Sequence, residues 1–207
     1  PQDIRFCKSC VMSNQRPSSV VEFKHTENDK KTTIHFDEDG VCDPCRYAEI
    51  KEQIDWSERE RELRDLCDRY RRKDGCYDCI MSGSGGKDSF YASHILKHKY
   101  GMHPLTVTWS PNIYTDWGWK NLQNWTHAGF ENFLNTPNQK IYRLLARIAL
   151  ENMFHPWHLW ILGQKNVPTK FARNLKIPLI IYGESPSEYG SPTEEYTSDY
   201  VIDWHTC

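Results

Sequence analysis

The chain has little that would bring it to a membrane or to nucleic acid. No apolar run in its 207 residues is long enough to span a bilayer, and no segment has the hydrophobic core of a signal peptide. The 26 basic and 28 acidic residues nearly cancel, to a net charge of -2, so no overall field attracts a polyanion or an anionic lipid surface. We therefore expect no membrane partner and no nucleic-acid partner.

Internal repeats and low-complexity tracts are also absent from the sequence, which excludes a repeat architecture. A chain of 207 residues is long enough for one α/β core and a small appendage. It begins at Pro1 without a methionine and stops soon after a strand-like segment. We therefore expect a processed or C-terminally truncated product.

Cysteine, by contrast, is plentiful, and six of the eight cysteines form three Cys-x-x-Cys pairs. The pairs Cys7/Cys10 and Cys42/Cys45 flank a polar, hairpin-like stretch. Four thiolates can complete a closed tetrahedral Zn²⁺ site, which would be structural because it leaves no open position. Residues 34–41 predict a short strand and a turn that would bring the two pairs together. Two disulfides or reduced core cysteines are the alternative.

A glycine-rich turn, Ser82-Gly83-Ser84-Gly85-Gly86-Lys87-Asp88-Ser89, follows an apolar strand and leads into a helix predicted over 87–100. Glycines let backbone N–H groups approach a phosphate closely, and a helix N-terminus adds the positive end of its dipole. Ser84 and Ser89 add hydroxyl donors, and Asp88 offers a carboxylate for Mg²⁺. Residues 82–89 therefore predict a nucleotide site.

The turn differs from two better-known phosphate loops. A Walker A loop needs Ser or Thr directly after Gly-Lys, but Asp88 follows Lys87. The dinucleotide fingerprint needs a third glycine where Asp88 stands. Residues Ser84 to Ser89 instead match Ser-Gly-Gly-x-Asp-Ser and resemble the PP-loop of ATP pyrophosphatases, which cleave ATP between its α and β phosphates. A glycine turn in an ordinary α/β domain is the alternative.

Two of the remaining cysteines are interpreted as packing residues. Cys79 lies in the apolar strand before the glycine turn, and Cys67 lies on a helix among apolar residues. A redox pair or an Fe–S ligand set is the alternative for Cys76 and Cys79. Thiol pairs beside a nucleotide loop indicate a reducing interior, so we expect a cytoplasmic protein.

Three parts follow one another along the sequence. Residues 1–45 form the cysteine module, residues 46–75 a charged and solvated helix, and residues 76–207 an α/β domain. In the last part strands are expected at 78–82, 104–109, 177–182 and 199–203, and helices at 87–100, 117–134, 140–152 and 157–174. Strands that alternate with crossover helices indicate a parallel, doubly wound sheet.

Ligands of doubly wound sheets lie at the carboxyl ends of the strands. Adenine is therefore expected near Val107 and Trp109, where backbone groups can bind its edge. Gly183 and Glu184 follow another strand and lie on the same rim as the glycine turn. Glu184 and Glu188 are predicted to ligate Mg²⁺ or to orient a substrate, the alternative being a polar loop.

Several segments together carry a more specific signal than the glycine turn alone. They are Cys7-x-x-Cys10-Val11-Met12, Asp39-Gly40-Val41-Cys42-x-x-Cys45-Arg46-Tyr47-Ala48-Glu49, Tyr77-Asp78-Cys79-Ile80 with Ser84–Ser89, and Tyr182-Gly183-Glu184 with Glu188-Tyr189-Gly190. With them the chain resembles, over most of its length, the N-acetyl sugar amidotransferases of bacterial surface-polysaccharide synthesis. Members of that family are longer, however, and the stretch between their cysteine pairs is shorter.

The resemblance implies a Rossmann-like sheet of the adenine nucleotide alpha hydrolase type and the cofactors ATP, Mg²⁺ and Zn²⁺. It implies that ATP adenylates the acetamido oxygen of a nucleotide-activated N-acetyl sugar and that ammonia then displaces AMP, leaving an acetamidino group. The nucleotide would be held by Ser82, Gly83, Ser84, Gly85, Gly86, Ser89, Val107, Trp109 and Gly183, with Asp88, Lys87 and Glu184 as catalytic residues.

The chain has no recognisable source of ammonia. A glutaminase with an N-terminal nucleophile needs cysteine at position 1, where Pro1 stands, and no cysteine belongs to a recognisable triad. The resemblance implies a separate glutaminase subunit and a cyclase-like subunit that channels ammonia. Two alternatives are a PP-loop tRNA thiolase that uses Cys76 and Cys79, and a non-catalytic assembly subunit that binds zinc and a nucleotide.

Overall fold

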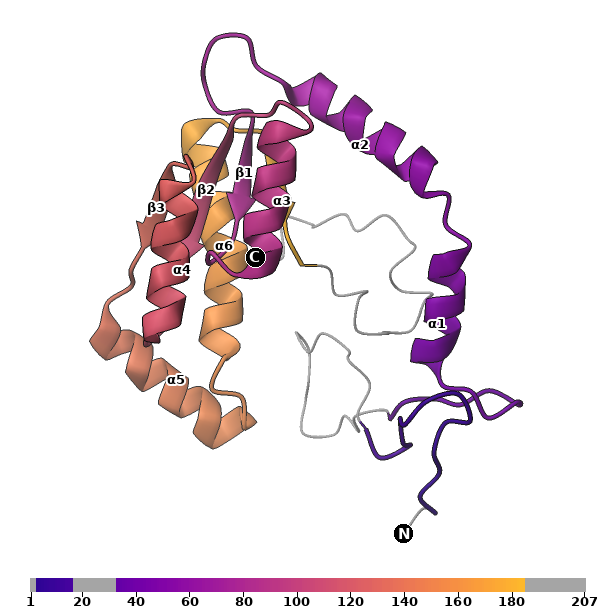
Figure 1. Cartoon of the computed structure of the whole chain (residues 1–207). Coiled ribbons are helices and arrows are strands. Elements are labelled where there is room, and N and C mark those ends of the chain that lie inside the picture. Colours follow the sequence, from indigo (N-terminus) through magenta and orange to yellow (C-terminus); the bar gives the residue numbers. More distant parts are fainter. Residues whose placement is uncertain (1–2, 17–32, 185–207) are drawn as a thin grey trace. The chain divides into compact units, whose positions relative to one another are not determined.

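The computed structural model describes residues 3–16 and 33–184, which form two compact units divided between Trp56 and Ser57 (Figure 1). The smaller unit contains the first two cysteine pairs. The larger unit contains the glycine-rich segment of residues 82–89, called the glycine loop below. Across the described ranges, no helix is both long and apolar enough to cross a lipid bilayer.

The smaller unit is built from short antiparallel pairings and one helix. Phe36 pairs with Cys42 across a turn in which the Gly40 N–H donates to the Asp37 carbonyl at 3.0 Å. Gly40 has a φ of +78°, a conformation that favours glycine. Helix α1 (Asp43–Glu52) follows at once, with a proline in its first turn where no backbone donor is needed. Of the strand predicted between the cysteine pairs, only the single pairing of Phe36 with Cys42 is present, and the predicted turn is present beside it.

The larger unit contains a four-stranded sheet in the order β3-β2-β1-β4. Its strands are β1 (Cys79–Ser82), β2 (Pro104–Trp109), β3 (Asn132–Asn135) and β4 (Leu179–Tyr182). Every neighbouring pair is parallel, and Ile80 of β1 pairs with both Leu105 and Ile180. The predicted α/β class with a parallel sheet is confirmed. Because all the strands run in one direction, their carboxyl ends share one edge of the sheet.

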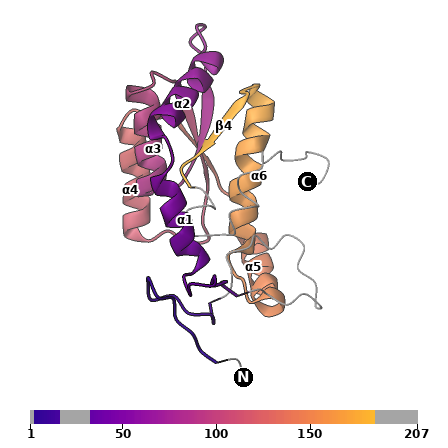
Figure 2. The same cartoon turned by 90° about the vertical axis from the view of Figure 1, so that its right-hand side faces the viewer.

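Helices lie on both faces of this sheet. They are α2 (Trp56–Tyr70), α3 (Lys87–His98), α4 (Asp116–His127), α5 (Gln139–Met153) and α6 (His158–Leu175). Side chains alternate along β1, so Cys79 and Met81 pack with residues of α2, α3 and α4, while Ile80 packs with α6. Figure 2 shows this larger unit with α3 and α4 on one side of the strands and α6 on the other.

The core on the α3 and α4 side is anchored by a buried indole. Trp125 of α4 is fully buried, and its Nε1 donates to the Ser93 hydroxyl of α3 at 2.7 Å. A buried tryptophan needs such a partner because its N–H would otherwise remain unsatisfied. Leu122, one helical turn earlier, contributes to the same core. The bond therefore fixes α4 against α3, next to the glycine loop.

One predicted helix is wrong in its second half. The expected helix over 117–134 ends at His127, and the edge strand β3 follows. Gly129 adopts a φ of +90°, which ends the helix in the way that glycine commonly does. Strand β3 was difficult to predict because its apolar residues, Phe133 and Leu134, are adjacent rather than alternating, and both are exposed.

The single helix predicted after the cysteine module is two helices. Helix α1 already begins at Asp43, and it is separated from α2 by residues 53–55. The apolar spacing from Ile50 onward suggested one continuous face, but the helical hydrogen-bond pattern ends at Gln53, whose N–H bonds the Ile50 carbonyl. The strand predicted over 199–203 lies outside the described residues.

Candidate functional site

The glycine loop connects the end of β1 to the start of α3 at the carboxyl edge of the sheet. Strand β1 ends at Ser82, and the Gly83 N–H donates to the Val107 carbonyl at 3.1 Å. Gly86 is the N-cap of α3 and supplies no side-chain cap. The free end of a helix dipole and its first N–H groups therefore lie at the end of the loop, which is the arrangement that binds anions.

Each of three glycines lies where a larger residue would collide with a neighbouring element. A Cβ at Gly83 would overlap the side chain of Ser89. A Cβ at Gly85, whose φ is +81°, would lie 2.9 Å from the Leu122 Cα of α4. A Cβ at Gly183, which follows β4, would lie 2.9 Å from the Ser89 nitrogen. The loop, α4 and the end of β4 are thus in direct backbone contact.

The polar side chains of the loop lie at the start of α3. The Lys87 Nζ is 2.6 Å from the Asp88 Oδ1, and the Lys87 side chain is 89% exposed. The Ser89 hydroxyl donates to the Gly86 carbonyl at 3.2 Å. The Asp88 carboxylate is partly exposed and could exchange its lysine partner for a cation.

Three other predicted site residues have distinct positions around this loop. Gly183 touches the start of α3, and Glu184 follows it as an exposed residue. Val107 is buried and reaches the loop through its carbonyl group. Glu188 lies outside the described residues.

Trp109 is directed away from the glycine loop. A Cβ at Gly163 of α6 would overlap the Trp109 indole, and the ring centre of Trp109 lies 5.7 Å from that of Tyr142. Among the described residues, neither the Trp109 Nε1 nor the Tyr142 hydroxyl has a hydrogen-bond partner. The side chain of Trp109 therefore packs between the sheet and α5 and α6, so it is the backbone of β2 that reaches the rim.

Two residues near the loop were not predicted to belong to the site. Leu122 of α4 supplies the backbone against which Gly85 packs, and Trp125 lies against Gly83. Their spacing of three residues on one helical face was available in the sequence as a packing signal. It gave no indication that this face would support the loop, because that depends on how α4 packs in three dimensions.

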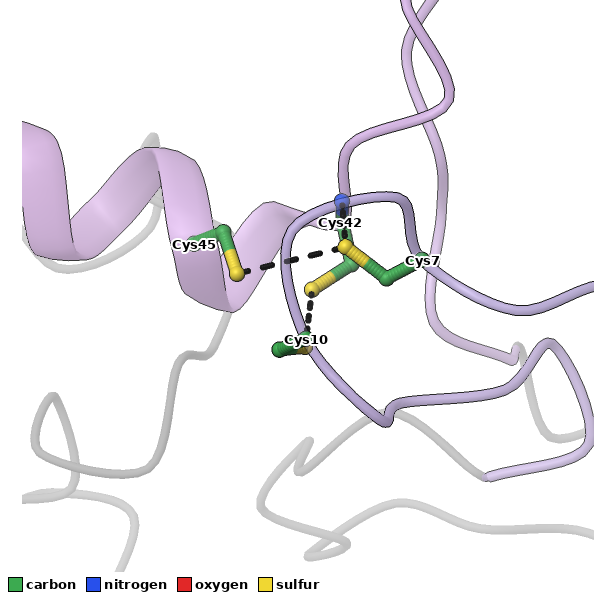
Figure 3. A group of neighbouring side chains, drawn as sticks. All are labelled: Cys7, Cys10, Cys42 and Cys45. Carbon is green, nitrogen blue, oxygen red and sulfur yellow. Dashed lines mark hydrogen bonds between the residues drawn. The ribbon is translucent and has the colours of Figure 1, made fainter.

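The four cysteines of the smaller unit converge on one point, with their side chains directed toward one another (Figure 3). The sulfur atoms of Cys7 and Cys45 are 4.0 Å apart, and those of Cys10 and Cys42 are 3.6 Å apart. A tetrahedral zinc ion with Zn–S bonds of about 2.3 Å needs sulfur atoms about 3.8 Å apart. The cluster is therefore able to hold a metal such as zinc.

Backbone N–H groups and a helix N-terminus lie next to these thiols. The Ser9 N–H donates to the Cys7 sulfur at 3.3 Å, and the Met12 N–H donates to the Cys10 sulfur at 3.4 Å. Cys42 and Cys45 lie at the start of α1, where the helix dipole favours negative charge. Such donors stabilise thiolates and orient them as ligands.

The pKa of Cys7 is shifted in the opposite direction from those of Cys42 and Cys45. Burial on its own would raise the pKa of Cys7, but hydrogen bonds from the backbone of Cys42, Ser9 and Cys10 lower it to about 6. Burial raises the pKa of both Cys42 and Cys45, and hydrogen bonds with the neighbouring thiols raise that of Cys45 further. The Cys7 thiolate therefore forms before those of Cys42 and Cys45, which lose their protons when a metal binds.

The third cysteine pair lies away from the glycine loop. Cys79 begins β1, and Cys76 precedes it, so both belong to the amino end of the strand whose carboxyl end carries the loop. Cys79 is fully buried beside Met81, and burial raises the pKa of its thiol to about 12. Cys76 is exposed. Cys67 is buried in the core that also contains Cys79, as its position on a packed helix predicted.

No protein-family profile matches the chain. An uncharacterized protein of Methanocaldococcus jannaschii is 31% identical to it over 83 residues. The matched region covers 40% of this chain and 29% of that protein, so the chain spans less than a third of the relative's length.

Proposed function

We propose that the larger unit binds ATP at the glycine loop and cleaves it to AMP and pyrophosphate, in the manner of PP-loop enzymes. The observation that carries this proposal is that Ser84–Ser89 follow the carboxyl end of β1 and include the N-terminus of α3, which has no side-chain cap. Gly85 packs against the backbone of Leu122, Gly83 packs against the side chain of Ser89, and Gly183 packs against the backbone of Ser89, so close contacts hold the loop in one shape. Backbone N–H groups and the helix dipole can then bind the phosphates without a large rearrangement.

The strand order supports the same location for the nucleotide. The chain passes from β1 to β2 and β3 on one side and returns with β4 on the other side of β1. In a doubly wound sheet this reversal marks the ligand crevice, at the carboxyl ends of the two strands next to it. Those ends are the glycine loop after β1 and Gly183-Glu184 after β4. We infer a doubly wound sheet of the PP-loop type from this order and from helices on both faces.

We propose that the acceptor is a nucleotide-activated N-acetyl sugar. The support is the resemblance described above, in which both cysteine pairs, the glycine loop and the Tyr182–Glu184 segment occur together. An acetamide carbonyl is a poor electrophile, and ammonia does not displace its oxygen. Attack of that oxygen on the α-phosphorus releases pyrophosphate and leaves an adenylated imidate. Ammonia then adds to the imidate carbon, AMP departs with the former acetamido oxygen, and an acetamidino group remains.

The residues of the loop would have different roles in this reaction. Ser84 and Ser89, with the backbone of Gly85 and Gly86, bind the departing pyrophosphate. Asp88 holds Mg²⁺, which neutralises the phosphate charge when it is bound. Lys87 lies beside Asp88 and supplies positive charge near the leaving group.

Glu184 follows Gly183 on the same rim, and we propose that it orients the sugar or shares the cation. The cysteine cluster, in this proposal, holds zinc as a structural centre because all four ligand positions are filled by the protein. Ammonia is delivered by a separate glutaminase, with a cyclase-like channel subunit. The N-acetyl sugar site and these partners rest on the resemblance alone.

The test uses the purified chain with Mg-ATP, ammonium chloride and a panel of nucleotide-activated N-acetyl sugars. AMP and pyrophosphate are quantified, and mass spectrometry follows replacement of the acetamido oxygen by NH. AMP formation that depends on one sugar and equals its conversion supports the proposal. ATP binding without pyrophosphate release, under conditions where the zinc content is complete, supports a non-catalytic subunit instead.

A tRNA thiolase is less well supported. That reaction needs a cysteine that can approach the adenylated base, but Cys76 and Cys79 lie at the amino end of β1, and the Cys79 thiol is fully buried. AMP release with unmodified tRNA and a sulfur donor, in the absence of any sugar, would reverse this preference.

A further inference from the structure

Helix α3 carries two histidines whose arrangement the nucleotide site does not use. His94 and His98 are four residues apart and both are exposed. The opposite face of the helix is fixed in the core by Ser89, Ser93 and Leu96. The histidine pair therefore stands on a helix that is anchored along its length, on the side that faces solvent.

The two imidazole rings already lie close to each other. Their centres are 4.4 Å apart and their planes are inclined by 44°. Side chains at i and i+4 are neighbours on a helix, and two histidines at this spacing bind a metal ion in known helical sites. Neither ring forms a hydrogen bond or an ion pair with another described residue, so no protein contact competes for the ring nitrogens.

The separation of the rings fits one coordination geometry better than another. An imidazole nitrogen about 2 Å from a metal places its ring centre about 3.1 Å from that metal, so two rings at a right angle have centres about 4.4 Å apart. A tetrahedral angle would separate the centres by about 5.1 Å. Right angles occur in square-planar and octahedral sites, which Cu²⁺ and Ni²⁺ favour.

We propose that His94 and His98 form a surface site for a divalent transition metal of tetragonal or octahedral preference, such as Ni²⁺ or Cu²⁺. Within residues 3–16 and 33–184, the cysteine cluster is the only group of three or more metal-ligating side chains close enough to share one ion. The histidine site therefore has two protein ligands, and water completes its coordination. It is chemically distinct from the cysteine site, since neutral nitrogen ligands replace thiolates.

Other histidines of the larger unit provide a comparison. The rings of His155 and His158 are also neighbours, but their centres are 5.9 Å apart, which is too far for a right-angled chelate. His127 is an exposed histidine near the end of α4. These residues allow the effect of paired, correctly spaced imidazoles to be separated from the effect of any surface histidine.

The experiment titrates Ni²⁺ into the full chain after the cysteine cluster has been saturated with zinc and free zinc has been removed. Calorimetry is expected to show one nickel site, and zinc released from the protein is measured in parallel. His94→Ala and His98→Ala should each weaken nickel binding by at least about tenfold, because a chelate becomes a single ligand. The double variant should bind nickel at least as weakly as either single variant, because the remaining imidazole ligand is removed as well. His127→Ala should bind nickel as the parent does.

A second measurement locates the ion directly. Paramagnetic Ni²⁺ should broaden the ring proton signals of His94 and His98 first, before those of His155 and His158. The proposal is overturned if His94→Ala retains the parent affinity, if broadening begins at His155, or if nickel uptake equals zinc release from the cysteines. Alanine is a good helix former at exposed positions, so the variants should keep the parent circular dichroism spectrum.

Discussion

Gly183 lies against the backbone of Ser89, so that a Cβ at Gly183 would come within 2.9 Å of the Ser89 nitrogen. This contact joins the end of β4 to the first turn of α3. Because β4 and β1 are parallel neighbours, it also brings two loops from distant parts of the sequence to one edge of the sheet. A glycine is needed here for close approach rather than for an unusual backbone angle.

Replacing Gly183 with alanine is therefore expected to separate these two segments. Overpacking against a rigid backbone should lower the free energy of unfolding by about 1–3 kcal/mol. ATP affinity should fall as well, if the glycine loop is the nucleotide site. Chemical denaturation and equilibrium ATP binding are the two measurements.

Gly86→Ala is the matched control for stability. A Cβ at Gly86 would meet only the Ser84 hydroxyl, at an ordinary 3.6 Å, and the backbone angle at Gly86 suits any residue. Its unfolding free energy should change little. If both substitutions lower the unfolding free energy equally, close packing at Gly183 is not the cause of the loss of stability.

Asp88→Asn tests whether the carboxylate holds a cation on the nucleotide. An amide is a weaker ligand for Mg²⁺ than a carboxylate, so the Mg²⁺-dependent part of ATP affinity should fall by about tenfold or more. Lys87→Ala serves as the comparison, because the Lys87 side chain is 89% exposed and should lose less. The measurement is ATP binding with and without Mg²⁺. An Asp88→Asn protein whose response to Mg²⁺ is unchanged would remove Asp88 from the cation site.

Local patterns in the sequence were sufficient for the parts of the fold that depend on neighbouring residues. Strand β2 has the predicted bounds, 104–109, because its apolar and threonine side chains alternate between turn signals. Helix α3 begins at Lys87, as the glycine turn before it indicates. The metal-binding character of the two cysteine pairs was also predictable, because the ligand spacing within each pair is a local pattern; the structure brings the pairs together.

Parts that depend on long-range packing could not be predicted in this way. Strand β3 lies at the sheet edge with Phe133 and Leu134 exposed, so burial leaves no period-two pattern in its sequence. Trp109 is the last residue of β2 and lies at the carboxyl edge of the sheet. Its indole packs against α6 at Gly163, where a side chain would overlap it. The support that Leu122 gives to Gly85 is likewise a contact between separate elements.

Loading of the cysteine cluster should release protons in a pattern set by the individual thiols. The pKa of Cys7 is lowered to about 6, so at about pH 7.5 this ligand is already a thiolate. Burial raises the pKa of Cys42 and Cys45, which therefore carry protons that zinc must displace. Calorimetry of zinc binding in buffers of different ionisation enthalpy measures the protons released. Acidification should expel the metal, since protons compete for the same sulfur atoms.

The same titration identifies the ligands. Cys10→Ser should lose stoichiometric zinc binding, whereas Cys76→Ser, at an exposed position outside the cluster, should keep it. Co²⁺ in the parent protein should show the absorption of a tetrahedral thiolate site. Zinc uptake without proton release, or full uptake by Cys10→Ser, would contradict a four-thiolate centre.

Asp78 is a buried carboxylate that joins two loops at the amino end of the sheet. It is 2% exposed, and its two oxygens accept hydrogen bonds from the Arg72 N–H at 2.5 Å and the His103 N–H at 2.7 Å. Asp78→Asn would keep the volume but turn an amide N–H₂ group toward one backbone donor. The unfolding free energy should fall by about 1–3 kcal/mol, because a buried N–H group is left without an acceptor.

Asp74→Asn separates this effect from a general loss of negative charge. Asp74 lies in the same turn, but its side chain is about half exposed and it pairs with Arg72 at the surface. Its replacement should cost little, since exposed ion pairs contribute little to stability. Because Asp78 acts at the edge of the sheet opposite the glycine loop, ATP affinity measured well below the unfolding transition should be the same in Asp78→Asn as in the parent. A large loss of ATP affinity in fully folded Asp78→Asn would mean that the two edges of the sheet are coupled.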